Sequence, residues 1–252
     1  MKFMRIYFVV FGILTLLSCK ENKDSSMTAQ EIVDRSIVAS GGSNYQTQDV
    51  SYNFRDRLYE SQNKKGKKVL RRITTTDSMV ITDIKQANGF QRFFNDSLIA
   101  LPDTLADKYA NSVNSVHYFS RLPYGLNDAA VKKELLGEVV IKGEDFYKVK
   151  VTFAQENGGK DFEDTYLYWF QKQSFKPQYL AYEYHTDGGG MRFREAYNER
   201  YVEGIRFVDY RNLKPQKGQK ADLLKIDSLY QANQLELLSK IELKEISVRP
   251  SN

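Results

Sequence analysis

Cysteine and histidine are scarce in this chain of 252 residues, and their scarcity excludes several kinds of chemistry. The single Cys19 rules out disulfides within the chain and cysteine metal sites. The two histidines, His117 and His185, have no histidine partner at metal-ligand spacing. HExxH, P-loop and GxSxG motifs are missing, as is a dinucleotide fingerprint after an expected strand. We therefore expect no metal, no cofactor and no catalytic residue, and interpret the protein as a non-enzyme.

The chain also lacks a strong charge excess and an apolar run long enough to span a bilayer comfortably. Its formal net charge of +5 becomes +3 once Lys2 and Arg5 are removed with the first 18 residues. An excess this small does not argue for a nucleic-acid partner. The longest apolar run, Ile6–Leu17, is shorter than the roughly 20 residues of a transmembrane helix.

The N-terminus has the features of a processing signal. A basic start is followed by the apolar run and then by Leu16-Leu17-Ser18-Cys19, which resembles a bacterial lipobox. The resemblance implies cleavage before Cys19 and acylation of that cysteine, for example with palmitate. An ordinary cleaved signal followed by a stray cysteine is the alternative. We expect a lipoprotein signal peptide over residues 1–18, a polar tether over 19–26 and a single domain over 27–252.

The segment Asp161–Tyr210 is the densest in aromatic residues and predicts four consecutive antiparallel strands. In Thr165–Phe170, the residues Leu167 and Trp169 point to one face, whereas Tyr168 and Phe170 point to the other. Both faces are bulky, so this strand is expected to be covered on both sides. The other three expected strands are Tyr179–Tyr184, Met191–Tyr197 and Ile205–Tyr210.

The remaining pattern predicts an α+β, mainly β fold: a curved antiparallel sheet, or half-barrel, with helices covering its concave face. Thr28 and Glu31 form a capping box that opens a helix over Met27–Gly42. Further helices are expected over Thr104–Ser120, Ala129–Leu136 and Ala221–Asn233. Strands are expected over Val50–Glu60, Val69–Thr76, Met79–Ile84, Phe90–Phe94, Ser97–Leu101, Val139–Ile141, Phe146–Phe153 and, with a bulge at Lys244-Glu245, 241–248.

Two groups of charged and aromatic residues invite a functional interpretation. Six basic residues surround one hairpin tip and form either a solvated tip or a contact with anionic lipid head groups: Lys64, Lys65, Lys67, Lys68, Arg71 and Arg72. A candidate ligand pocket combines residues of the 104–120 helix with the aromatic strands: Asn114, His117, Arg121, Trp169, Tyr182, Tyr184, Arg192 and Arg194. The alternative is that Arg192 and Arg194 form ordinary cross-strand pairs with Glu183, Glu195 or Asp209.

The order of these elements resembles that of lipoprotein-carrier-like (Lol-type) half-barrels and, more closely, an uncharacterised family of outer-membrane lipoproteins. The segments NSVHYFSRLPYGLND and GGGMRFREAYNERYVEGIRFVDY carry the resemblance. It implies a curved sheet around an apolar groove. We expect a membrane-anchored envelope protein that binds a lipid or other apolar ligand, held through Cys19 at the outer membrane, on either the periplasmic face or the cell surface. The alternative is a structural or protein-interaction module whose core is filled by its own side chains, and the sequence names no protein partner.

Overall fold

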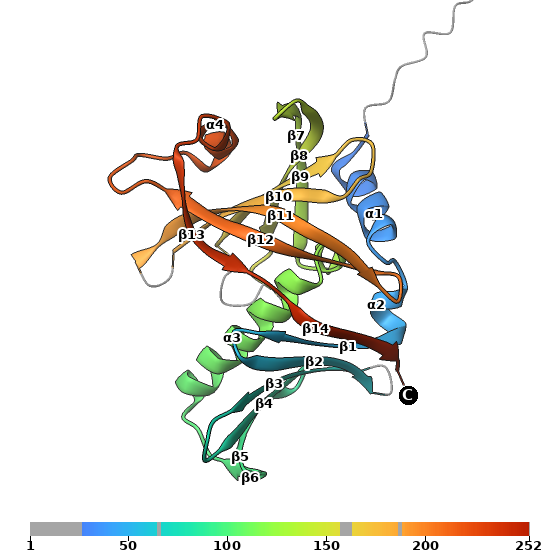
Figure 1. Cartoon of the computed structure of the whole chain (residues 1–252), viewed down its shortest axis with the longest axis vertical. Helices are drawn as coiled ribbons and strands as arrows, with labels where there is room; N and C mark the ends of the chain where they lie inside the picture. Colours follow the sequence, from blue (N-terminus) through green and yellow to red (C-terminus); the bar gives the residue numbers. More distant parts are fainter. Residues whose placement is uncertain (1–26, 65–66, 157–162, 186–187, 252) are drawn as a thin grey trace, which may run out of the picture.

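Two seven-stranded antiparallel sheets make up most of the chain (Figure 1). This computed structural model describes residues 27–64, 67–156, 163–185 and 188–251. The mainly β class with a few covering helices is confirmed, and the hydrogen bonding divides the strands between two sheets. Cys19 and the expected signal and tether lie outside the described residues. Within the described ranges, no helix is both long and apolar enough to cross a membrane.

The first sheet is a meander of consecutive strands, and the last strand of the chain is added at one edge. Its strand order is β14-β1-β2-β3-β4-β5-β6. The bounds are Gln48–Phe54 (β1), Arg57–Lys64 (β2), Lys67–Thr75 (β3), Val80–Gln86 (β4), Gly89–Phe94 (β5), Ser97–Ile99 (β6) and Lys244–Pro250 (β14).

The second sheet contains the aromatic strands in consecutive order, as the sequence predicts. Its strand order is β13-β12-β11-β10-β9-β8-β7. The bounds are Val131–Ile141 (β7), Glu144–Phe153 (β8), Thr165–Gln171 (β9), Pro177–Tyr184 (β10), Gly190–Val202 (β11), Ile205–Pro215 (β12) and Leu235–Ile241 (β13).

The N-terminal helices and the long central helix pack on the core between the sheets, and the short C-terminal helix covers the other face of the second sheet (Figure 1). The capping box at Thr28 and Glu31 is present at the start of α1. The long helix α3 packs against β3, β4 and β5 of the first sheet. The bounds are Ala29–Ala39 (α1), Asn44–Thr47 (α2), Asp103–Ser120 (α3) and Ile226–Gln231 (α4), with short 3₁₀ turns at Tyr124–Asn127 (η1) and Leu223–Lys225 (η3).

Strand β9 is buried on both faces, which confirms the prediction from its alternation. Tyr168 and Phe170 belong to the large core between the sheets. Leu167 and Trp169 belong to a second core on the opposite face of the sheet, which α4 and η3 cover. The second sheet therefore separates two hydrophobic layers, of which only one faces the first sheet.

Three predicted elements are wrong in type or extent. Residues 129–136 are not a helix, because most of them pair with β8 as part of the edge strand β7. The expected strand Val50–Glu60 is a hairpin, because Arg55 and Asp56 both have positive φ and form a two-residue turn. The register of β14 does shift near Lys244-Glu245, but residues 241–248 are not one strand, because β13 and β14 belong to different sheets.

Candidate functional site

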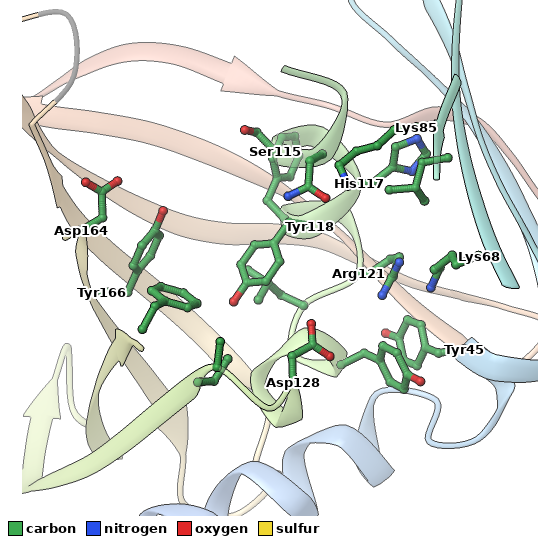
Figure 2. A pocket seen from close by; sticks show the side chains of 18 of the residues that line it. Tyr45, Lys68, Lys85, Ser115, His117, Tyr118, Arg121, Asp128, Asp164 and Tyr166 are labelled. Atoms are coloured by element: carbon green, nitrogen blue, oxygen red, sulfur yellow. The ribbon is translucent and has the colours of Figure 1, made fainter. Parts of the chain in front are cut away.

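A cavity of about 1350 Å³ lies between the two sheets, with the C-terminal half of α3 along it (Figure 2). Its lining combines nine aromatic side chains with six basic and two acidic ones. The aromatic residues are Tyr45, Tyr118, Phe119, Tyr124, Phe153, Tyr166, Tyr168, Tyr182 and Tyr184. The charged residues are Lys67, Lys68, Lys85, Arg121, Arg192, Arg194, Asp128 and Asp164.

Seven of the eight pocket residues that the sequence predicts line this one cavity. They are Asn114, His117 and Arg121 at the end of α3, Tyr182 and Tyr184 on β10, and Arg192 and Arg194 on β11. Their role in binding a ligand stays a prediction.

Trp169 is the exception, because it lies on the other face of the second sheet. Its Nε1 donates a hydrogen bond to Asp227 at 3.1 Å, and its ring packs against Phe193. Lys148 binds the same carboxylate at 2.7 Å. The alternation along β9 assigns Trp169 to the face opposite Tyr168, so the sequence pattern itself separates it from the cavity.

The two arginines of β11 are held by tyrosines rather than by acids. Arg192 donates to the Tyr184 hydroxyl at 2.7 Å, and Arg194 donates to the Tyr182 hydroxyl at 3.1 Å. Each guanidinium also lies about 5 Å from the centroid of the ring it binds, at 5.0 Å and 5.2 Å. Two of the three acids that the alternative assigned to them contact other residues, since Glu195 binds Arg211 and Asp209 binds Arg200.

His117 is a buried, neutral acceptor in the cavity wall. Its Nε2 lies 3.1 Å from the Arg71 carbonyl oxygen, and because a carbonyl only accepts, Nε2 carries the proton. Burial lowers the pKa of His117 to about 3, and the positive charge of Arg121 acts in the same direction. The Nδ1 atom is buried without a hydrogen-bond partner among the described residues. His117 can therefore accept a hydrogen bond but does not supply a positive charge.

Two cations share one tyrosine at the end of the cavity nearest the first sheet. The Lys68 Nζ and the Arg121 Cζ lie 5.5 Å and 5.4 Å from the centroid of the Tyr124 ring. Tyr124 in turn stacks on Tyr45 at 4.8 Å. Figure 2 shows Lys68, Arg121 and Tyr45 together at this end, and Asp164 and Tyr166 at the other.

Burial lowers the pKa values of both of these cations. Burial lowers the pKa of Lys68 to about 7, with a further contribution from the charge of Arg121. Burial also lowers the pKa of Arg121, against the opposing effect of Asp128. Burial raises the pKa of the Tyr45 hydroxyl. Positive charge is therefore concentrated where little water is available to solvate it.

The sequence did not identify Tyr45 or Lys68 as cavity residues. The sequence places Lys68 among six basic residues at a hairpin tip, but Lys68 lines the cavity, and Arg72 is buried against Asp83. The alternation of β3 offers a signal, because Lys68 shares a face with Leu70 and Arg72, which both point toward α3. Tyr45 offers no comparable signal, since it lies on the one-turn helix α2.

The lining combines apolar and charged surfaces in one cavity. Stacked aromatic rings provide an apolar wall, and the cations provide charge at its ends. Among the residues that the structure describes, no group of three or more His, Cys, Asp or Glu side chains could hold a metal ion.

Several solved structures resemble the chain at low sequence identity. A LolA superfamily protein from Nitrosomonas europaea is 13% identical with a TM-score of 0.47, covering 90% of this chain and 94% of that one. A putative outer membrane lipoprotein-sorting protein domain from Vibrio parahaemolyticus is 8% identical with a TM-score of 0.39, covering 81% and 84%. The lipoprotein LppX from Mycobacterium tuberculosis is 13% identical with a TM-score of 0.28, covering 63% and 87%. At these scores, no residue or ligand of those proteins is assigned to this chain.

The sequence comparisons identify a family whose function is unknown. No curated protein matches the sequence at a significant level. One family model matches residues 6–243, which is most of the chain. The chain therefore belongs to a family of unknown function (DUF6503), in agreement with the uncharacterised family that the sequence resembles.

Proposed function

We propose that this protein is an envelope lipoprotein that binds a lipid or similar amphiphile in the cavity between its sheets, without catalysis. The observation that carries the proposal is a cavity of about 1350 Å³ with nine aromatic residues in its wall. Pockets for drug-sized ligands occupy about 300–1,000 Å³, so this cavity is large enough for a longer molecule. Burial of an acyl chain there would contribute about 0.8 kcal/mol for each CH₂ group.

The proposed anchor is the acylated Cys19, with the outer membrane as its location. The lipobox-like residues Leu16–Cys19 support this part of the proposal. Two or more acyl chains on the cysteine would hold the protein stably at a bilayer. The cavity would then lie within reach of lipid, on either the periplasmic face or the cell surface.

Native mass spectrometry of the detergent-extracted protein tests the binding function. We expect co-purified mass in the lipid range that is lost after denaturation. Ala130 lines the cavity and its neighbour Ala129 is exposed, so Ala130→Trp should reduce the bound mass and Ala129→Trp should leave it unchanged. Because a larger side chain can also strain a packed wall, the thermal unfolding of both variants is measured alongside.

The alternative function is a structural or protein-interaction module with a self-filled core. A core of that kind would leave no cavity of this size between the sheets. If the wild-type protein carries no lipid and takes up none from added phospholipid vesicles, the lipid-binding function is wrong and the alternative is favoured.

A further inference from the structure

Four of the six cations that line the cavity fall into two pairs according to their contacts. Arg192 and Arg194 already donate to tyrosine hydroxyls at the far end. The side chains of Lys68 and Arg121 form no hydrogen bond or ion pair with any other described residue, although both line the cavity. The Nε atom of Arg121 is buried and has no hydrogen-bond partner among the described residues. A buried guanidinium nitrogen without a hydrogen-bond partner costs free energy. A ligand group that accepts a hydrogen bond would therefore be stabilising at this end of the cavity.

The surrounding residues do not provide that acceptor. Asp128 is the carboxylate whose charge acts on both cations, but it is exposed and forms no ion pair with either of them among the described contacts. His117 has an acceptor nitrogen, but that nitrogen forms no hydrogen bond with any described residue and, because the imidazole is neutral, it offers no negative charge. The Tyr45 hydroxyl is buried and unpartnered beside them and can donate.

We propose that Lys68, Arg121 and Tyr45 bind the anionic head group, a phosphate or a carboxylate, of the amphiphile held in the cavity. This inference rests on the proposed binding function and names the class of ligand. Arg121 would give a charge-assisted hydrogen bond from its fork of N–H donors, and Lys68 a second charge. The apolar part of the ligand would lie along Tyr166, at the other end of the cavity, and along Phe153, whose ring centroid is 5.7 Å from that of Tyr166.

The test compares two fluorescent probes of equal chain length, cis-parinaric acid and its methyl ester. The acid carries the carboxylate and the ester does not, so the ratio of their dissociation constants isolates the head group. We expect the wild-type protein to bind the acid about tenfold more tightly or better, as a single charge-assisted contact predicts. Arg121→Gln and Lys68→Gln should each weaken binding of the acid much more than binding of the ester, and so bring the ratio toward one.

Matched controls separate charge from folding and from nonspecific attraction. Lys64→Gln removes the same charge from an exposed position on β2 outside the cavity and should keep the wild-type ratio. The affinity for the ester reports whether each variant retains a folded cavity. Calorimetry with inorganic phosphate tests a free anion as the ligand.

The possible outcomes separate this inference from the proposed function. Equal binding of acid and ester by the wild type, or an unchanged ratio in both cavity variants, would overturn the head-group site and leave amphiphile binding standing. Binding of neither probe would overturn both. Binding of inorganic phosphate as tightly as the acid would replace the head group with a free anion.

Discussion

Lys68 places a titratable charge in the cavity wall with a pKa near neutral pH. Burial and the charge of Arg121 lower its pKa to about 7, while Asp128 acts in the opposite direction and His117 stays uncharged. A lysine in the unfolded chain has a pKa of about 10.4. Between these two values the unfolded chain binds a proton that the folded chain does not, so stability rises with pH across this window. Below about pH 7 both states are protonated and the full penalty of the buried charge remains.

Replacement of this lysine should therefore stabilise the apo protein in a pH-dependent way. We expect Lys68→Met to raise the free energy of unfolding at about pH 6 by roughly 1 kcal/mol or more, the value of one unit of pKa shift. The gain should shrink as the pH approaches 10. Urea unfolding across this pH range measures it, with Lys64→Met as the control at an exposed position. A gain that does not vary with pH would contradict the assigned titration of Lys68.

At the scale of single residues, the sequence predicts which side chains of one helix or strand lie together. It does not predict which side chains from two different elements meet. His117 and Arg121 are four residues apart, at the end of one helix, so helical periodicity places them together. Tyr45 and Lys68 reach the same end of the cavity from α2 and β3. Their meeting depends on how the sheets pack, and no local period encodes that distance.

At the scale of elements, a buried charge cluster joins three strands of the first sheet to α3. Asp83 on β4 binds Arg72 of β3 at 2.6 Å and Arg92 of β5 at 2.7 Å. Arg72 also donates to Ser112 of α3 at 2.8 Å. The Asp83 side chain is only 1% exposed, so removal of its charge leaves the buried Arg72 and the largely buried Arg92 without a counter-charge.

We expect Asp83→Asn to destabilise the protein by about 3 kcal/mol, because loss of one partner from a buried ion pair typically costs that much. Glu60→Gln is the matched control, since Glu60 pairs with Arg71 on neighbouring strands but is more exposed, at 23%. That change should cost less than about 1 kcal/mol. Denaturant unfolding of the three proteins gives the comparison, and equal losses would show that burial does not decide the strength of these pairs.

A predicted element is confirmed where its sequence pattern has one explanation, and is wrong where two explanations compete. The capping box at Thr28 and the two-faced alternation of β9 have no other simple interpretation, and both are confirmed. Residues 129–136 contain Ala, Lys, Glu and Leu, which favour helices, yet they form much of β7. Pairing with β8 overrides that local preference, because the long-range hydrogen bonds are invisible in a short window.

At the scale of the whole molecule, the second sheet separates the cavity from a second packed layer. Tyr168 and Tyr182 face the cavity, whereas Trp169 faces α4 and is fully buried there. Trp169 is the only tryptophan of the chain, so its fluorescence reports on one layer alone. A ligand held between the sheets has no contact with it.

This arrangement predicts which tryptophan a bound lipid can quench. Brominated fatty acid quenches by contact, so it should leave the emission of Trp169 in the wild-type protein nearly unchanged. A Trp169→Phe, Phe153→Trp double variant moves the single tryptophan to the cavity wall, and there the same fatty acid should quench strongly. The non-brominated fatty acid controls for binding without quenching. Strong quenching of Trp169 would instead place the lipid against α4, on the opposite face of the sheet, because contact quenching does not act through two layers of packed side chains.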